Sequence, residues 1–172
     1  MQAVKDPGCG HEEAIERMVN EWQLPLLRLC YIQLRDQGLA EDAVQETFLK
    51  AFRGIQSFRG ECSEKTWLTR IAVNTCRDMQ RGGWFRHIDR RVTLDMLPEA
   101  ASQPPEEYSD LTLAVINLPR KYREAMMLYY YQDMDTAEIG VVLGIAQSTV
   151  SNRLRKGREL LRKTLERRDP NA

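Results

Sequence analysis

The sequence predicts an all-α protein of two small helical domains joined by a flexible linker, the second of which contains a helix-turn-helix. Apolar residues recur at helical spacing in residues 12–79 and again from residue 111 onward. Between them lies a segment with a Gly-Gly pair and three prolines, and roughly 30 residues of this kind are long for a connection inside one compact domain. Two amphipathic segments around Gly144 complete the pattern. We therefore expect a first domain at residues 1–79, a linker at 80–110 and a second domain at 111–172.

The first helix is expected at residues 12–35, where apolar residues return every three or four positions. Pro25 is expected to kink or restart this helix, because proline lacks the N–H group and its ring clashes with the preceding turn. Gln37-Gly38 is expected to end it.

A second helix is expected at residues 40–56. Its predicted apolar face consists of Val44, Phe48, Ala51, Phe52 and Ile55. The residues that lie off this face are Asp42, Gln45, Glu46, Leu49 and Arg53. Acidic side chains near a helix N-terminus interact favourably with the helix dipole, which is a sufficient structural reason for Asp42 and Glu46.

A polar loop at residues 57–65 precedes a third helix at Thr66–Met79. Arg70, Asn74 and Arg77 follow one another at i, i+4 and i+7, so they share one polar stripe of that helix. Trp67 opens the helix directly after the loop, where an aromatic ring can serve the core, a binding surface or both.

The second domain contains the clearest local signals. Pro119 suits the first position of a supporting helix. Asp135 is a candidate N-cap with Glu138 at capping-box spacing, and Gly144 is placed to end the following helix at positive φ. A helix, a glycine turn and a second helix form the helix-turn-helix plan, in which the second helix enters the major groove of DNA.

The last helix has one apolar and one basic side. Its apolar side consists of Val150, Leu154, Leu160, Leu161 and Leu165. Periodicity alone leaves a plain helical hairpin and a DNA-binding motif equally open. From Arg153 to Arg168, however, eight arginines or lysines stand against two glutamates, and a helical face of one charge sign favours phosphate binding.

Composition agrees with a globular chain and limits the function classes. The 172 residues are 42% hydrophobic and 29% charged, with a net charge of zero, and basic residues exceed acidic ones only in the last third. No apolar run reaches the roughly 18 residues that indicate a membrane span, and the first residues lack the apolar core of a secretory signal, so a cytoplasmic protein is expected. The four cysteines lack metal-ligand spacing; Cys30 and Cys76 are expected to be buried free thiols, and no metal site or cofactor is predicted.

Two stretches resemble the extracytoplasmic-function (ECF) sigma factors of bacterial RNA polymerase. The first is AEDAVQETFLKAFRGIQSFRGECSEKTWLTRIAVNTCRD, Ala40–Asp78, which is similar to region 2 of that family. The second is LPRKYREAMMLYYYQDMDTAEIGVVLGIAQSTVSNRLRKGRELLRKTL, Leu118–Leu165, which is similar to region 4. They cover about half of the chain, in the order that the family has them.

The resemblance implies two roles for the first domain. The helix that starts near Ala40 would dock on a coiled coil of the polymerase β′ subunit through Asp42, Gln45, Glu46 and Leu49. The next loop and helix would melt the −10 promoter element and hold a flipped base, which needs stacking and polar contacts to the base edge. The residues implied at this −10 site are Phe58, Arg59, Glu61, Cys62, Ser63, Lys65, Trp67, Arg70, Asn74 and Arg77.

The resemblance also implies that the last helix reads the −35 element. The residues implied there are Gln147, Ser148, Thr149, Ser151, Asn152, Arg153, Arg155, Lys156 and Arg158. Base contacts specify sequence and phosphate contacts position the protein. Ser151 and Asn152 are therefore expected to govern promoter choice, and Arg153 and Arg158 are expected to contact phosphates. Ser151 stands where many members have a basic residue. Gln147-Ser148 departs from the residues common at the helix start, so a different cap is expected there.

The implied function is that of an alternative sigma factor, which is not an enzyme. It would bind core RNA polymerase through the β′ coiled coil and the β flap, recognise promoter DNA and help to open the duplex, and an anti-sigma factor would be a further partner. No small-molecule substrate, no membrane insertion and, since the chain ends soon after Leu165, no further C-terminal domain are expected.

Two other functions compete with this one. A stand-alone helix-turn-helix regulator would carry a ligand-sensing or dimerising first domain, which the region 2 match disfavours. An enzyme would need a nucleophile–base pair, a glycine-rich phosphate loop or metal-ligand spacing, and the sequence shows none of these.

Overall fold

The computed structural model describes residues 9–82 and 106–168, and all regular structure in these two ranges is helical. This confirms the predicted all-α fold class. The chain divides into two compact units, Met1–Arg90 and Arg91–Ala172. Most of the linker expected at residues 80–110 lies outside the described residues, although the flanking helices extend into it at both ends. No helix in the described ranges is long and apolar enough to span a membrane.

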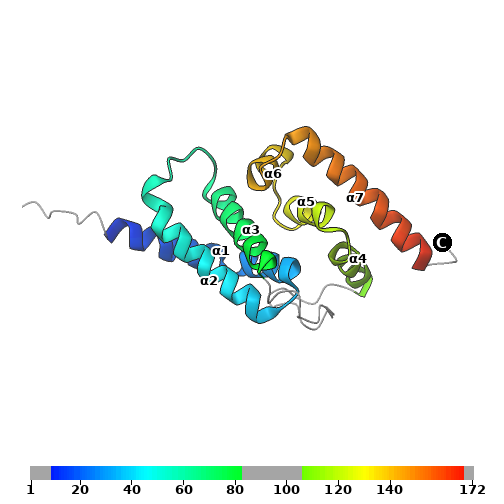
Figure 1. Cartoon of the computed structure of the whole chain (residues 1–172), viewed down its shortest axis with the longest axis horizontal. Coiled ribbons are helices and arrows are strands. Elements are labelled where there is room, and N and C mark those ends of the chain that lie inside the picture. Colours follow the sequence, from blue (N-terminus) through cyan, green and yellow to red (C-terminus); the bar gives the residue numbers. More distant parts are fainter. Residues whose placement is uncertain (1–8, 83–105, 169–172) are drawn as a thin grey trace, which may run out of the picture. The chain divides into compact units, whose positions relative to one another are not determined.

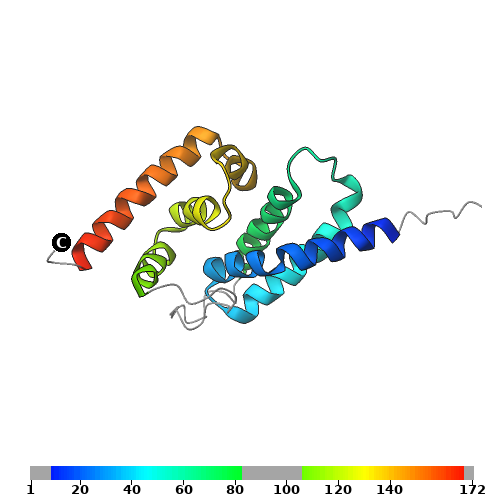
Figure 2. The same cartoon turned by 180° about the vertical axis from the view of Figure 1, so that it is seen from behind.

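The first unit is a bundle of three helices and one short turn. These are α1 (Cys9–Leu34), α2 (Gln37–Gly54), the 3-10 turn η1 (Ile55–Ser57) and α3 (Glu64–Arg81). Helices α1 and α2 lie side by side and run in opposite directions, and α3 packs against both, as the two views show (Figures 1 and 2). Cys30 of α1 and Cys76 of α3 are buried free thiols, as predicted.

The junction between α1 and α2 differs from the prediction. Gln37-Gly38 does not end the first helix but forms the first turn of α2. The helix α1 ends earlier, at Leu34, because Arg35 takes a left-handed conformation with φ of 58°. Asp36 then caps α2 by accepting a 2.8 Å hydrogen bond from the backbone N–H of Leu39.

Pro25 does not restart the first helix either. It lies inside α1, which continues through it from Cys9 to Leu34. The apolar residues on both sides of it, Leu26, Leu29 and Met18, are almost fully buried. Tertiary packing of this face therefore holds the helix together despite the backbone hydrogen bond that proline cannot make.

The second unit contains the four remaining helices, α4 (Glu106–Ile116), α5 (Arg120–Tyr130), α6 (Thr136–Leu143) and α7 (Gln147–Arg168). The long α7 contacts each of the other three (Figure 1). Pro119 precedes α5 as its N-cap residue, with ψ of 139°, rather than occupying its first helical position as predicted.

A buried arginine joins α4 to α5. Arg123 is only 7% exposed. One of its terminal nitrogens, Nη1, donates to the carbonyl oxygens of Ile116 at 3.0 Å and Leu118 at 3.1 Å. The first carbonyl belongs to the last residue of α4 and the second lies two residues beyond it, where no helical N–H is left to pair with them. The guanidinium therefore caps one helix from the next.

The turn between α6 and α7 has the predicted local structure. Asp135 and Glu138 form a complete capping box, and Gly144 has a φ of 67°. The backbone N–H of Ile145 closes the turn by donating to Gly140 O at 3.0 Å. A Cβ atom on Gly140 would lie 2.9 Å from Ile145 O, so the missing side chain permits this close approach.

The substitution Arg123→Met should lower the free energy of unfolding of the second unit by about 2–4 kcal/mol, because two buried carbonyls lose their donor. Chemical denaturation followed by circular dichroism measures this change. Arg162→Met is the matched control, since Arg162 is exposed on α7 and pairs only with Glu166 among the described residues. It should change the stability by no more than about 0.5 kcal/mol. Equal effects of the two substitutions would contradict the capping role of Arg123.

Candidate protein and nucleic-acid interfaces

One face of α2 combines carboxylates with an apolar side chain. Asp42, Gln45, Glu46 and Leu49 are spaced at i, i+3, i+4 and i+7 and therefore share this face. Asp42 and Gln45 are exposed, and no hydrogen bond or ion pair occupies either side chain among the described residues. Glu46 lies 3.8 Å from Lys50 Nζ, a long and partly exposed ion pair that a partner can displace. We name this set the α2 face.

A shallow groove of about 480 Å³ adjoins the α2 face. Residues of α1 and α2 line it: Ile15, Val19, Gln23, Val44, Gln45, Phe48, Leu49 and Phe52. Leu49 is 50% exposed and Phe52 49% exposed. Phe52 was predicted to lie on the apolar face, yet the core side of α2 is filled mainly by small residues, and the ring remains at the surface. In the sequence, the presence of apolar residues on more than one side of α2 was the signal that some of them would remain exposed.

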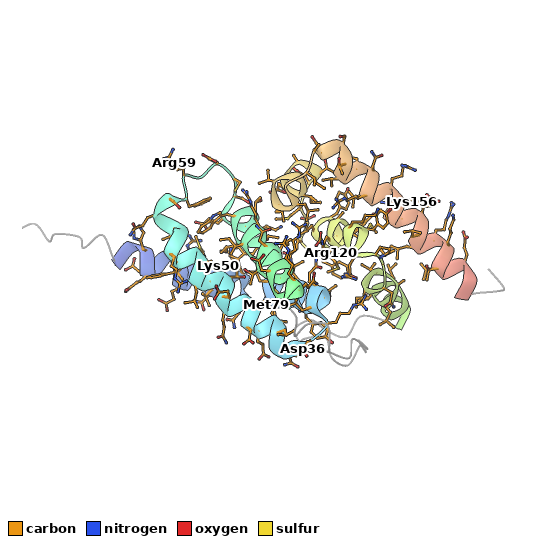
Figure 3. The ribbon with its side chains drawn as sticks, in the orientation of Figure 1. Asp36, Lys50, Arg59, Met79, Arg120 and Lys156 are labelled. Carbon is orange, nitrogen blue, oxygen red and sulfur yellow. The ribbon has the colours of Figure 1, made fainter. Side chains whose placement is uncertain are left out.

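The loop between η1 and α3 is held by an aromatic pair. The rings of Phe58 and Trp67 stack, with centroids 4.6 Å apart and planes 20° apart. Gly60 at the tip of the loop has a φ of 72°, and Arg59 beside it is exposed on the loop (Figure 3). A stacked pair next to an exposed polar loop offers the surface on which an unpaired base can stack.

Ser63 ends this loop and begins α3. Its Oγ accepts a 3.1 Å hydrogen bond from the backbone N–H of Thr66, so the side chain serves as the N-cap of the helix. Ser63 also shares a 2.8 Å hydrogen bond with the Thr66 hydroxyl. The third helix consequently starts at Glu64, two residues before its predicted start.

A paired set of hydrogen bonds fastens the start of α3 to α1. Arg17 Nη1 and Nη2 donate to the two carboxylate oxygens of Glu64 at 2.9 and 2.8 Å. Hydrogen bonding from Arg17 lowers the pKa of Glu64, so the carboxylate stays charged below the usual range. Sequence reasoning did not find this pair, because its members are 47 residues apart.

The remaining residues predicted at the −10 site lie in the loop and along α3. Glu61 is exposed and Cys62 half-buried in the loop, and Lys65 is half-buried in the first turn of α3. Arg70 and Asn74 are exposed on α3, and Arg77 is half-buried. The predicted stripe of Arg70, Asn74 and Arg77 therefore exists on an α-helix that begins at the loop.

The outer side of α7 contains both engaged and unengaged polar residues. Ser148, Thr149, Asn152 and Arg155 are exposed and have no side-chain partner in the described part of the chain. The engaged side chains are Gln147, whose Nε2 donates to Thr136 Oγ1 at 2.8 Å, and Ser151, whose hydroxyl donates to Gln147 O at 3.2 Å. Arg153 is half-buried. The Gln147 bond ties the start of α7 to the start of α6.

Three further basic residues of α7 are held by neighbours. Lys156 Nζ donates to Glu159 Oε2 at 3.0 Å (Lys156 is labelled in Figure 3), and Lys163 Nζ donates to Glu159 Oε1 at 3.2 Å. These hydrogen bonds, that from Lys156 first, lower the pKa of Glu159. Arg158 Nε donates to Tyr130 Oη at 2.8 Å. Glu159 therefore neutralises part of the basic face.

Comparisons with known proteins agree with this arrangement. The model of sigma-70 region 2 matches residues 18–86, and that of sigma-70 region 4 matches residues 108–161. The chain is 32% identical to the ECF RNA polymerase sigma factor SigW of Bacillus subtilis over 94% of both chains. The protein belongs to the ECF sigma factors of RNA polymerase.

Two further relatives support the assignment to the ECF sigma factors. SigE of Mycolicibacterium smegmatis is 32% identical over 86% of this chain and 60% of its own length. The structure of the sigma factor RpoE in complex with the anti-sigma factor NepR, from Bartonella quintana, superposes with a TM-score of 0.63 at 26% identity, over 88% of this chain and 98% of that one. The order of region 2 and region 4 along the chain and the fold of this ECF sigma factor are therefore those of its family.

Glu159→Gln should strengthen binding of the protein to duplex DNA and steepen its salt dependence. Releasing Lys156 and Lys163 for phosphates would change the slope of log K against log salt concentration by up to about 2 units. Fluorescence anisotropy with a labelled duplex over a range of KCl concentrations measures the slope. Glu166→Gln is the control, because Glu166 pairs with Arg162 alone in the described part of the chain and should change the slope by about half as much. A slope that Glu159→Gln leaves unchanged would show that the two lysines do not meet DNA.

Proposed function

We propose that the protein is a dissociable specificity subunit of RNA polymerase that directs the enzyme to promoters with particular −35 and −10 elements and helps to open the duplex. The observation that carries this proposal is the presence, in one chain of this family, of an open acidic face on α2, an aromatic loop before α3 and a basic helix α7. The protein would have no catalytic activity or cofactor of its own. Because its proposed partners are in the bacterial cytoplasm, we place it there.

The α2 face is the proposed contact with the β′ coiled coil of core polymerase. Asp42 and Gln45 are exposed and unengaged, so binding would not first break an internal bond. Leu49 at 50% exposure supplies apolar area beside the carboxylates. A partner helix with basic residues around an apolar centre complements this combination.

The loop after η1 is the proposed −10 site. The Phe58–Trp67 stack provides an aromatic platform, and the exposed Arg59 and Glu61 provide polar groups for a base edge or a phosphate. Extruding a base costs a few kcal/mol. The Arg17–Glu64 pair and the Ser63 cap fix the end of the loop where it joins α3 before DNA binds. Less conformational entropy is therefore lost when the loop becomes ordered on binding.

The N-terminal part of α7 is the proposed −35 reader. Asn152 and Arg155 are the unengaged side chains best suited to base edges, since asparagine pairs with adenine and arginine with guanine. The hydroxyl of Ser151 already donates to its own helix and remains available mainly as an acceptor. We therefore assign promoter choice chiefly to Asn152 and Arg155, with Ser151 in a lesser role.

An anti-sigma factor is the proposed inhibitor. RpoE of Bartonella quintana was solved in complex with one, NepR, and this chain shares its fold. The groove between α1 and α2 adjoins the α2 face and exposes Phe52 and Leu49. A protein seated there would cover the polymerase contact.

Run-off transcription with purified core polymerase tests the proposal. The templates are a pool of duplexes with randomised upstream sequence, and the transcripts are sequenced. We expect start sites that appear only with the protein and share two spaced motifs. Specific duplex binding by the protein alone, without core-dependent transcripts, would instead indicate a stand-alone regulator.

Glu46→Lys should abolish core polymerase binding while leaving the fold intact, because it reverses a partly exposed charge on the α2 face. Native gel electrophoresis with core enzyme measures binding, and circular dichroism checks the fold. Asp78→Lys is the control, with the same charge change at an exposed position of α3. Equal loss in both variants would point to overall charge rather than to the α2 face.

Asn152→Ala should flatten sequence preference at one −35 position by about 1–3 kcal/mol, because a bidentate base contact is lost. Sequencing of run-off transcripts from the randomised pool measures the preference at every position. Asn117→Ala, an equal truncation at an exposed residue before α5, should leave it unchanged. If the −35 preference survives in Asn152→Ala, another residue reads that position.

A further inference from the structure

Two tyrosines at the end of α5 hold an arginine of α7. Arg158 Nε donates a 2.8 Å hydrogen bond to Tyr130 Oη. The guanidinium carbon lies 5.6 Å from the centre of the Tyr129 ring and 5.8 Å from that of Tyr130. The two rings meet edge to face, with centroids 4.9 Å apart. Because Tyr130 is 54% exposed, this cluster lies at the surface of the second unit.

The cluster keeps hydrogen-bond donors for an anion. The phenol oxygen of Tyr130 uses one lone pair to accept from Arg158, which leaves its O–H free to donate. Arg158 uses only Nε, and its two terminal nitrogens have no partner in the described part of the chain. The phenol O–H and the guanidinium N–H groups are therefore available together at one place.

Arg158 also differs from its basic neighbours in charge balance. Lys156 and Lys163 both pair with Glu159, and Arg162 lies 3.6 Å from Glu166. No acidic side chain pairs with Arg158 among the described residues. The tyrosine rings restrain the guanidinium without neutralising it, so less side-chain entropy is lost when it binds an anion.

The position of the cluster points to the DNA backbone. Arg158 follows Ser151 and Arg155 at i+7 and i+3, so it lies on the same stripe of α7. Tyr130 reaches this stripe from α5, at the flank of the helix rather than at its tip. Side chains at the flank of a recognition helix meet phosphates, whereas those near its N-terminus meet base edges.

We infer that Tyr130 of α5 joins Arg158, for which the family resemblance already implies a phosphate contact, in one phosphate-binding site for the promoter backbone. Tyr130 positions the Arg158 guanidinium and donates its own O–H to a phosphodiester oxygen, and Tyr129 supports the arginine through its ring. The site extends the DNA contact of the second unit from α7 to α5. This inference rests on the proposed function, because it needs α7 to dock on the promoter.

The test compares variants of the full-length protein as holoenzyme on the promoters that the wild type selects from the randomised pool. Affinity is measured over a range of KCl concentrations. Arg158→Gln should lower the salt slope by about 0.9, the value for one phosphate. Tyr130→Phe, which keeps the ring, should weaken binding about three- to tenfold on every selected promoter, with little change in slope. Adding Tyr130→Phe to Arg158→Gln should weaken binding less than it does in the wild type, because part of its effect acts through the arginine.

Tyr131→Phe is the matched control. Its hydroxyl is also exposed and shares a 3.2 Å hydrogen bond with Thr112, away from Arg158. Its promoter affinity should equal that of the wild type. Melting temperatures of Tyr130→Phe and Tyr131→Phe should agree, which separates a DNA contact from a packing role.

Several outcomes would overturn the site. Tyr130→Phe could bind promoters with wild-type affinity, or it could lose affinity for particular promoter sequences only. Its lower affinity could also follow from a lower melting temperature or from weaker binding to core polymerase. If the wild-type holoenzyme selects no promoters at all, the proposed function fails first, and the phosphate site fails with it.

Discussion

The burial of one side of α7 decides which residues of the second unit can meet another molecule. Val150, Leu154 and Leu161 are almost fully buried against the shorter helices. Gly157 allows a particularly close approach to α5, since a Cβ there would lie 3.0 Å from the side chain of Met126. This packing turns the polar side of α7 outward and places Arg158 beside Tyr130. The position of the proposed DNA-binding surface is thus a consequence of core packing.

In the first unit, too, the packing of the core decides which side chains of a helix remain at the surface. The buried side of α2 is formed largely by small residues, among them Ala40, Ala43 and Ala51, which bring α1 and α3 close. Larger apolar residues, Leu49 and Phe52, remain outside next to carboxylates. Neighbouring apolar side chains that are exposed beside a groove mark a surface that a partner can cover. The surface composition therefore agrees with a subunit that binds a larger assembly.

Local signals made the helices and the helix-turn-helix predictable. The capping box of Asp135 and Glu138 and the left-handed Gly144 depend on neighbours in sequence, and the structure has both. Contacts between distant residues could not be predicted in this way. The pair Arg17–Glu64 joins residues 47 apart, and Arg158 meets Tyr130 from 28 residues away. The end of α1 at Leu34 and the N-cap of α2 at Asp36 were also not predicted. The pair Gln37-Gly38 resembles a helix end in the sequence, although it forms the first turn of α2. The assignment of site residues drew on family resemblance, whereas their division into engaged and unengaged side chains required coordinates.

Site-specific photo-crosslinking in the holoenzyme tests most directly whether the two units read two separate promoter elements. A photoreactive phenylalanine analogue is placed at position 59 in one protein and at position 152 in another, and the crosslinked bases are mapped on a selected promoter. We predict that position 152 on α7 reacts with the upstream element and that position 59 on the loop before α3 reacts with the downstream element. Crosslinks from both positions to the same stretch of DNA, or from neither position to DNA, would contradict this division.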